Sequence, residues 1–488
     1  QLARSIAGFH YREHWVVGAP IHSHSPPFYP VILAVAGFLS GHRLDAYLFL
    51  NLAFVVTAFL LLFDAVRRLW SPGVALLMLV MLVANPGLVQ LGGEIMSEAP
   101  YLALSAVAIW IPTRQSMDRK WMVAFGTAAI LAALTRSVGI TLLVAVFLLW
   151  VLERQWRALW IFSVAAGGLV GSWLLWTALA PHELHGGRTY MADVVAGSAE
   201  HGFLIEFWER VTTRLPAYLA RIIPWELPLP VAPGTVADNV FWVVVLVGLG
   251  ALGVASTWRR WKVFTLYLLA YGALLALWTW LVGRFLAPVT PLIVVVLLAG
   301  ADVIRRRYSA GLGLAVGLGL AGVVFLTGFR ANWERLQEFR SCDRSAPLQS
   351  PGCFDPDQRS LFAATSFVAE STPDSTKVVT AKEATFAYYS GRRVTRPHPV
   401  LSTDPAEFVN RVVESGADYI FLGRNAAIES GPYPETLQQA CRSLELVESF
   451  PPSSHLFRLG SHVAPDTTSA ACRALADFRS TLPPRLPE

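Results

Sequence analysis

Ten apolar segments, most of them close to the length that crosses a bilayer, constrain this chain more than any other feature. A spanning helix needs about 20 apolar residues, within a range of about 17 to 25. An eleventh apolar run, 28–41, is shorter, and we expect it to form an interfacial or re-entrant helix. The sequence therefore predicts a mostly α-helical, polytopic transmembrane bundle. The ten segments are 45–66, 71–88, 96–112, 121–135, 138–152, 158–180, 239–256, 262–281, 285–301 and 309–328.

Lysine and arginine lie mostly in alternate short loops between these segments. Residues 1–330 contain 23 Lys and Arg, of which 13 are in five such loops. Cytoplasmic loops are enriched in these residues, so we expect the five loops in the cytoplasm and segments 1–44, 87–97, 181–238 and 330–488 outside it. The chain would be a multi-pass protein of the inner or plasma membrane. The residues are Arg67, Arg68, Arg114, Arg119, Lys120, Arg154, Arg157, Arg259, Arg260, Lys262, Arg305, Arg306 and Arg307.

The end of the chain has the composition of a soluble domain. The whole chain is 15% charged, well below the roughly 25% of soluble domains, which excludes an ordinary soluble enzyme. Residues 331–488, however, carry 35 charged residues out of 158. Strands are expected at 377–380, 417–422 and 456–459, with helices near 358–370 and 404–416 between them, as in a small α/β domain. We therefore predict three parts: an outer juxtamembrane loop 1–44, a bundle 45–329 of about ten helices, and an extracytoplasmic α/β domain 330–488.

All four cysteines, Cys342, Cys353, Cys441 and Cys472, lie in the C-terminal part. An even number of cysteines in a segment outside the cytoplasm favours two disulfides. Cys342–Cys353 with Cys441–Cys472 is the simplest of three pairings, and buried free thiols are the alternative.

Polar residues at the outer ends of apolar segments are the candidates for chemistry. Glu94 and Glu98 precede and open one segment, and a carboxylate at that depth needs a partner or a function. The alternative for Glu98 is a favourable place in the first turn of a helix that Ser97 caps. Arg136 and Arg284 also lie at outer ends, where guanidinium groups match a lipid phosphate, or extend to the interface without a ligand. We expect Glu98, Arg136 and Arg284 to converge at the outer membrane rim.

Two further stretches on the outer side carry weaker signals. His22 and His24 alternate along an extended segment, where two imidazoles could hold a metal ion, although no third ligand stands nearby. Binding of a divalent metal ion is therefore one interpretation of the two histidines, and polar loop residues without a metal are the alternative. Apolar residues recur at helical spacing across 203–223, which predicts an amphipathic interfacial helix that Pro216 would kink.

Short motifs spread along the chain resemble the GT-C superfamily of membrane glycosyltransferases. The most similar group contains protein O-mannosyltransferases and lipid A aminoarabinose transferases. Each motif is short, and their order and spacing carry the resemblance. The motifs are Leu2–Gly8 (LARSIAG), Gly18-x-Pro20, Pro26–Pro30 (PPFYP), Ser97–Tyr101 (SEAPY), Leu134–Gly139 (LTRSVG), Gly283–Pro288 (GRFLAP), Tyr388–Arg393 (YYSGRR) and Gly416–Tyr419 (GADY).

The resemblance implies a hexosyl- or pentosyltransferase. Such an enzyme moves a sugar from a polyprenyl-phosphate carrier to a glycan, lipid or protein acceptor outside the cytoplasm, with inversion at the anomeric carbon. Glu98 and Glu94 would be active-site acids, and Arg136, Arg284, His24 and Tyr29 would bind the donor. The acid of the first outer loop is expected upstream of Gln1, together with a first membrane span. The bilayer is an expected partner, and nucleic acid is not.

Two other classes compete with a transferase. A transporter or flippase of a lipid-linked or small polar substrate predicts inverted repeats, broken helices at matching places and ionisable residues at the midplane, and none of these is clear in the sequence. A sensor whose bundle only anchors the C-terminal domain would not need so many spans.

Overall fold

The computed structural model describes most of the chain as two compact units. One comprises Gln1–His22, Ala180–Arg188 and Arg335–Glu488, and the other Ser23–Leu179 and Thr189–Glu334. The residues whose structure is described are 2–8, 10–22, 25–114, 118–179, 203–231, 237–278, 283–343, 345, 348, 353–395, 405–424, 433–452, 454–459 and 465–481.

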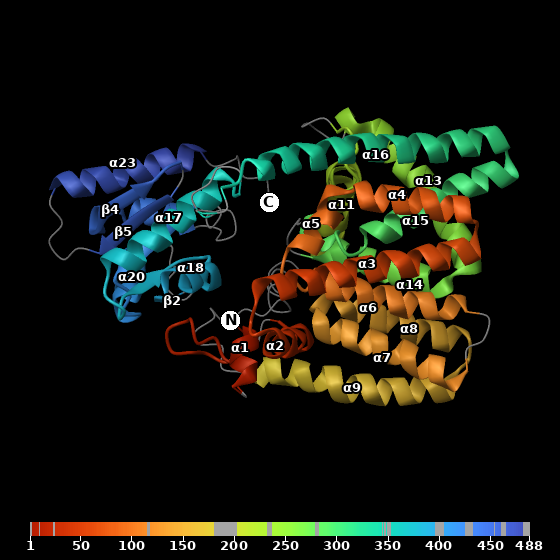
Figure 1. The fold of residues 1–488 in the computed structure, drawn as a ribbon, viewed down its shortest axis with the longest axis horizontal. Helices are drawn as coiled ribbons and strands as arrows, with labels where there is room; N and C mark the ends of the chain where they lie inside the picture. The colour runs from red at the N-terminus through yellow and green to blue at the C-terminus, as the bar shows by residue number, and fades with distance from the viewer. Residues whose placement is uncertain are drawn as a thin grey trace. The chain divides into compact units, whose positions relative to one another are not determined.

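The larger unit is a bundle of apolar helices (Figure 1). The sequence predicted about ten spans; among the described residues, four helices, α3, α9, α13 and α16, are long and apolar enough to cross a bilayer, and α4 and α5 together form a bent fifth candidate. The chain is thus a multi-pass membrane protein. The helices are α2 (Phe28–Ser40), α3 (Leu44–Leu69), α4 (Pro72–Ala84), α5 (Pro86–Gly93), α6 (Glu98–Trp110), α7 (Arg119–Thr135), α8 (Ile140–Leu152), α9 (Trp156–Leu179), α11 (Phe203–Ala217), α12 (Ile223–Glu226), α13 (Val240–Arg260), α14 (Lys262–Leu277), α15 (Thr290–Arg307) and α16 (Ala310–Arg340), with short helical turns η1 (Ile111–Thr113), η2 (Ser137–Gly139), η3 (Tyr218–Ile222), η4 (Ala237–Asn239) and η5 (Gly283–Phe285).

The segment 71–88 is not the single helix that its hydropathy predicts. The chain bends by 65° between α4 and α5. The bend lies at Asn85, which is extended and accepts a hydrogen bond from the Leu88 amide through its side chain, so that it caps α5. Pro86 lacks an amide hydrogen and disfavours a helical conformation at Asn85. An Asn-Pro pair within an apolar run thus ended one helix and began another.

The segment 203–223 contains the expected amphipathic helix, and Pro216 lies inside it. α11 holds this proline, and the chain then changes to a π-helix, η3, before α12. Arg210 donates a hydrogen bond to the carbonyl oxygen of Leu277 over 2.8 Å, which fastens α11 to the end of α14.

Glycines allow α13 and α15 to pack backbone against backbone. A methyl group on Gly253 would lie 1.9 Å from the carbonyl oxygen of Val296, and one on Gly300 would lie 2.2 Å from that of Leu249. Lipid tails are as apolar as leucine, so close packing of small residues is a main source of helix association in membranes.

The smaller unit contains a five-stranded sheet of order β2-β1-β3-β5-β4. β1 is parallel to β2 and β3, whereas β5 is antiparallel to β3 and β4. Successive side chains alternate between its faces, so that Val378 and Phe421 enter one core and Val379 and Ile420 the other. The fold class is as predicted, a helical bundle and a small α/β domain, although the sequence did not predict β2, β4 and the last helix. The elements are α1 (Leu2–Ala7), α17 (Pro356–Ser371), β1 (Lys377–Val379), α18 (Glu383–Ser390), β2 (Arg393–Thr395), α20 (Pro405–Glu414), β3 (Tyr419–Gly423), α22 (Tyr433–Gln439), η6 (Cys441–Ser443), β4 (Leu444–Phe450), β5 (Ser454–Leu459) and α23 (Pro465–Thr481).

Two disulfides close this unit. They join Cys342 to Cys353 and Cys441 to Cys472, the simplest of the three pairings that the sequence left open.

Candidate functional site

Glu98, Arg136 and Arg284 meet at one end of the bundle. Glu98 opens α6 and is fully buried, and its Oε1 pairs with both guanidinium groups. Arg136 follows α7 directly, and Arg284 lies in η5, so three separate parts of the chain supply the cluster. Removing a carboxylate from water is costly unless charges and hydrogen bonds compensate, and two arginines provide that compensation here.

The two arginines differ in their exposure. Arg136 is buried; its Nη1 also donates to Ser97 Oγ over 3.3 Å, and its guanidinium lies 5.8 Å from the centre of the Phe285 ring. The side chain of Arg284 is 56% exposed. Its Nε donates to Glu98, and its two Nη atoms donate to none of the described residues. One carboxylate between two guanidinium groups leaves a net charge of +1, with the accessible donors on Arg284.

Ser97 does not cap α6 through its side chain, contrary to expectation. It stands at the N-cap position without a side-chain cap hydrogen bond. Its hydroxyl instead accepts from Arg136 and lies 3.5 Å from Glu98 Oε2. The competing charge of the guanidinium group explains the difference, because charged donors make stronger hydrogen bonds than backbone amides.

Buried polar side chains hold the backbone around the cluster. Tyr271 on α14 donates its hydroxyl to the carbonyl oxygen of Phe285 over 2.6 Å, which fixes the turn that carries Arg284. On the other side, Asn51 in the first third of α3 donates to the carbonyl oxygens of Glu94 and Met96, just before Glu98. These contacts set the backbone on both sides of the ion pairs.

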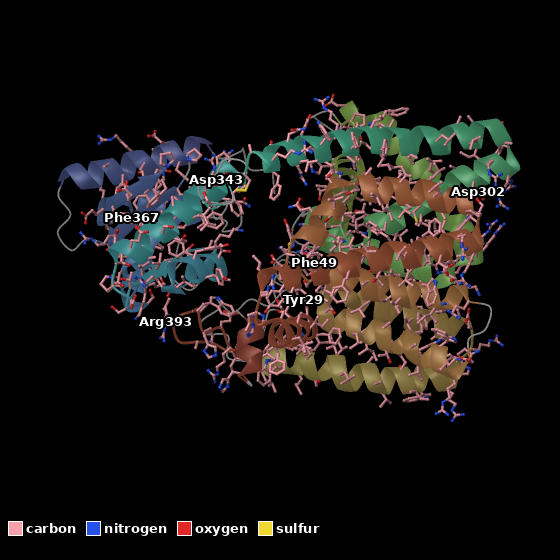
Figure 2. The ribbon with its side chains drawn as sticks, viewed as in Figure 1. Tyr29, Phe49, Asp302, Asp343, Phe367 and Arg393 are labelled. Carbon is pink, nitrogen blue, oxygen red and sulfur yellow. A yellow bond between two sulfur atoms is a disulfide. The ribbon has the colours of Figure 1, made fainter. Side chains whose placement is uncertain are left out.

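Tyr29 and Glu94 are among the residues around the Glu98 cluster. The Tyr29 hydroxyl donates to Asn51 Oδ1 over 3.1 Å, and the ring is buried. Glu94 follows α5, and its carboxylate accepts from Gln90 rather than from an arginine. Tyr29 lies at the end of the bundle opposite Asp302, which binds Arg305 and Arg306 (Figure 2).

One of the two candidate histidines, His22, is described, and it contacts a carboxylate. His22 Nδ1 lies 2.6 Å from Glu13 Oε1, and both side chains are buried. His24 lies outside the described residues. In the part of the chain that the structure describes, no group of three His, Cys, Asp or Glu is placed to hold a metal ion.

Glu226, at the end of α12, is a further acid near the Arg284 turn. A methyl group on Gly283 would lie 2.7 Å from its Oε1, and one on Gly87 would lie 3.4 Å from its Oε2. Its backbone carbonyl accepts from Asn85. Burial raises the pKa of the Glu226 carboxyl to about 7.

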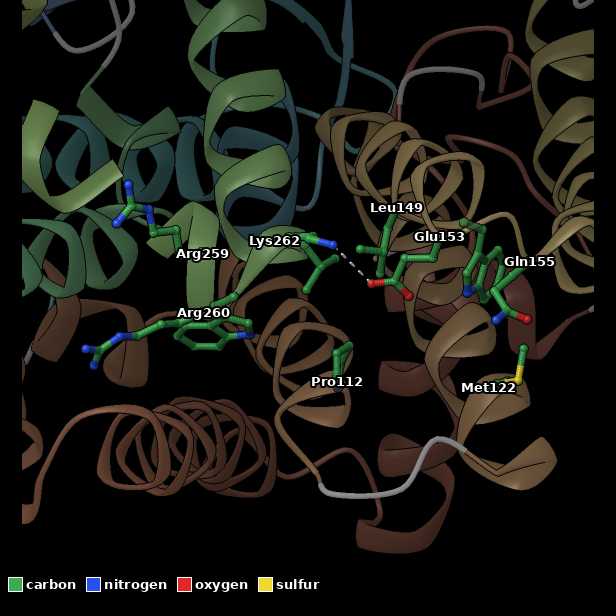
Figure 3. A pocket seen from close by; sticks show the side chains of 11 residues that line it. Pro112, Met122, Leu149, Glu153, Gln155, Arg259, Arg260 and Lys262 are labelled. Carbon is green, nitrogen blue, oxygen red and sulfur yellow. Dashed lines mark ion pairs between the residues drawn. The ribbon is translucent and has the colours of Figure 1, made fainter. Parts of the chain in front are cut away.

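A cavity of about 310 Å³ lies at the other end of α6 and α7. Pro112, Met122, Glu153, Lys262 and two arginines are among the residues that line it. Lys262 Nζ lies 3.9 Å from Glu153 Oε1, whereas Arg259 and Arg260 extend away from that pair (Figure 3). Pro112 follows α6 and Glu98 begins it, so about 20 Å of helix separates the cavity from the Glu98 cluster.

Sequence reasoning missed Asn51, Tyr271 and Glu226. A lone Asn inside an apolar span was a usable signal for Asn51, because polar groups there need partners. Nothing in the pattern singled out Tyr271 from other aromatic residues of its segment. Glu226 interrupts an apolar stretch, Pro224–Pro230, but its approach to Gly283 depends on tertiary packing.

Comparisons with known proteins agree with this architecture. Residues 24–176 match the model of the dolichyl-phosphate-mannose-protein mannosyltransferase family. No curated protein sequence is significantly similar to the chain.

Solved structures with a similar fold include ArnT and the oligosaccharyltransferase AglB. ArnT from Cupriavidus metallidurans in the apo state is 14% identical, with a TM-score of 0.52 over 93% of this chain and 91% of ArnT. The same protein bound to undecaprenyl phosphate gives 13% and 0.51, over 95% of this chain and 93% of ArnT. The oligosaccharyltransferase AglB from Archaeoglobus fulgidus, with an inhibitory peptide and a dolichol-phosphate, is 12% identical, with a TM-score of 0.52 over 95% of this chain and 70% of AglB. The chain therefore shares its fold with ArnT and AglB.

Proposed function

We propose that the chain is a membrane glycosyltransferase that moves a sugar from a polyprenyl-phosphate carrier to an acceptor outside the cytoplasm, with inversion. The observation that carries this proposal is the Glu98–Arg136–Arg284 cluster, which has a net positive charge and exposed donors on Arg284. A phosphate head group supplies the negative charge that this cluster lacks. Structural relatives bound to undecaprenyl phosphate and dolichol-phosphate support a lipid-phosphate donor.

In this proposal, an acceptor hydroxyl attacks the anomeric carbon while the bond from that carbon to the phosphate oxygen breaks. The phosphate leaves with the electron pair, and a carboxylate takes the proton of the hydroxyl. Arg284 binds the departing phosphate directly, since fixed donors aimed at growing charge stabilise a transition state. Arg136 and Glu98 hold Arg284 in place, and Tyr29 and Glu94 support the backbone beside them. His24 remains a candidate donor-binding residue. Whether the sugar is a hexose or a pentose, and whether the acceptor is a glycan, a lipid or a protein, depends on contacts beyond this cluster.

The test is sugar transfer in proteoliposomes that contain the full-length protein, a panel of radiolabelled polyprenyl-phosphate sugars and membrane-extract acceptors. We expect Arg284→Ala to lower kcat/KM by roughly 10²- to 10³-fold, because the phosphate loses its exposed guanidinium group. Arg284→Lys should recover part of this loss, since lysine keeps the charge but not the planar fork.

Arg307→Ala is the matched control, because Arg307 is exposed at the far end of α15. Equal transfer by the wild type and Arg284→Ala would remove the proposed phosphate site. Movement of the intact lipid-linked sugar across the bilayer without cleavage would instead support a flippase.

A further inference from the structure

The first residues of the chain form a hairpin that belongs to the C-terminal sheet domain. The N-terminal hairpin, residues 11–22, has an antiparallel bridge between Arg12 and Ile21. The amide of Glu13 donates to the carbonyl of Pro20 over 2.9 Å, and that of His22 to the carbonyl of Tyr11 over 2.8 Å. Gly18 has a φ of 81° in the turn, which glycine adopts without steric cost.

A buried contact between a carboxylate and an imidazole closes the hairpin from inside. Glu13 Oε1 and His22 Nδ1 are 2.6 Å apart, and the ring of Tyr11 meets that of His22 edge-on at 5.2 Å. Helix α1 is held against the start of the hairpin, since the amide of Arg12 donates to Ser5 Oγ over 3.1 Å. The hairpin is therefore held in one conformation by specific side-chain and backbone contacts.

The tip of the hairpin extends the sheet beyond its edge strand β2. Val16 and Val394 form a parallel bridge; the amide of Val394 donates to the carbonyl of Trp15 over 3.0 Å, and the amide of Val17 to the carbonyl of Val394 over 2.8 Å. Val16 is buried in the same core as Val394 and Phe386. Added strands of this kind gain affinity from main-chain hydrogen bonds and specificity from the pockets of alternate side chains.

We propose that the C-terminal domain positions the first outer loop for sugar transfer by holding the N-terminal hairpin as an extra strand of its sheet. This inference rests on the proposed function, because it assigns the domain a role in that reaction. Only residues 23–27 connect the hairpin to α2, which begins at Phe28. An extended link of five residues spans at most about 18 Å, so docking of the hairpin restricts the segment that leads to Tyr29. Val16 and Val17 are thus positioning residues that act through the backbone.

The test removes one hydrogen bond and leaves the rest of the sheet intact. Val17→Pro deletes the amide that donates to Val394, whereas Val17→Ala, its matched control, keeps that amide. Hydrogen exchange of peptides covering 10–22 reports docking, and peptides from β1 and β3 report whether the domain stays folded. We expect faster exchange in 10–22 alone, and a kcat about ten- to hundred-fold below that of Val17→Ala with a KM for the donor within about two-fold, because misplaced catalytic parts slow the reaction.

Undocking without loss of transfer would overturn the inference. If Val17→Pro leaves residues 10–22 protected, Val16→Asp replaces it, with Val16→Ala as control, since a carboxylate in the core of Val394 and Phe386 cannot stay buried unpaired. A detached hairpin together with a kcat within about two-fold of the control contradicts positioning in either case. Absence of transfer by the wild-type protein would instead count against the proposed function itself.

Discussion

Glu98 carries a charge into a fully buried position, and the residues around it show how the chain accommodates that charge. Both arginines bind the same oxygen, Oε1, and the Ser97 hydroxyl lies beside the other. Arg136 is buried with Glu98, whereas Arg284 is more than half exposed. At this scale the cluster divides into a structural pair, Glu98 with Arg136, and a third member that remains able to meet a ligand.

Glu226 is expected to make the stability of the protein depend on pH. Its pKa of about 7 exceeds the ordinary value of 4.5, so between these values the folded protein keeps a proton that the unfolded chain releases. Stability contributed by Glu226 should therefore fall as pH rises from 4.5 to 7 and stay low above 7. We expect Glu226→Gln to be more stable than the wild type above pH 7 by about 2 kcal/mol, after a discount for partial exposure. Melting temperatures in detergent from pH 5 to 8 measure this difference.

Glu209→Gln is the control, because Glu209 is exposed on α11 and should leave the pH slope unchanged. If wild type and Glu226→Gln show the same dependence of melting temperature on pH, then Glu226 is not protonated in the folded protein at neutral pH.

At the scale of elements, close helix contacts and helix breaks position the candidate site. α6 and α7 present Glu98 and Arg136 at one end of the bundle, although these residues begin one helix and follow the other, because the two helices run antiparallel side by side (Figure 1). The break at Asn85 brings α5 toward α12, and the side chain of Asn85 donates to the backbone of Glu226 there. Irregular turns, rather than regular helix, thus carry Arg136 and Arg284.

The contact between α13 and α15 allows a sharp test of packing. Gly253→Ala places a methyl group against the Val296 carbonyl, so α13 and α15 must separate, and we expect a loss of about 1–3 kcal/mol. Gly250→Ala on the same helix meets no atom within 4 Å and should change stability little. Thermal unfolding of both variants in detergent measures the difference. Equal melting temperatures would show that the two backbones are not in contact.

At the scale of the whole molecule, the chain combines a membrane bundle with a disulfide-bonded sheet domain. α16 has 31 residues and is about 46 Å long, which exceeds the roughly 30 Å of a hydrocarbon core. Its last part, from Arg330 to Arg340, is rich in charged residues. We therefore expect this helix to extend from the bilayer into water before the disulfide between Cys342 and Cys353, at the start of the C-terminal domain.

The side of the membrane on which each part of the chain lies can be predicted from its charges and disulfides. Arginine-rich loops favour the cytoplasm and disulfides favour an oxidising compartment. A cysteine introduced as Gln155→Cys, between α8 and α9, should react with an impermeant maleimide only after right-side-out vesicles are opened. Glu414→Cys, exposed at the end of α20, should react in closed vesicles. Labelling in the reverse order would invert the topology, and the unsubstituted chain, whose four cysteines are paired, gives the background.

The sequence alone was enough to predict the helical bundle, the separate sheet domain and the types of residue that form the Glu98 cluster. Apolar runs of bilayer length allow few folds, because every backbone amide in lipid needs an internal partner. Glu98, Arg136 and Arg284 could be selected because charges beside such runs are costly. Only the tertiary structure decided that both arginines share one oxygen of Glu98, and that Tyr271 and Asn51 fix the turns beside them. The pairing of Val16 with Val394, almost 380 residues away along the chain, is likewise seen only in the structure. These contacts join segments far apart in sequence, and local periodicity holds no information about which segments meet.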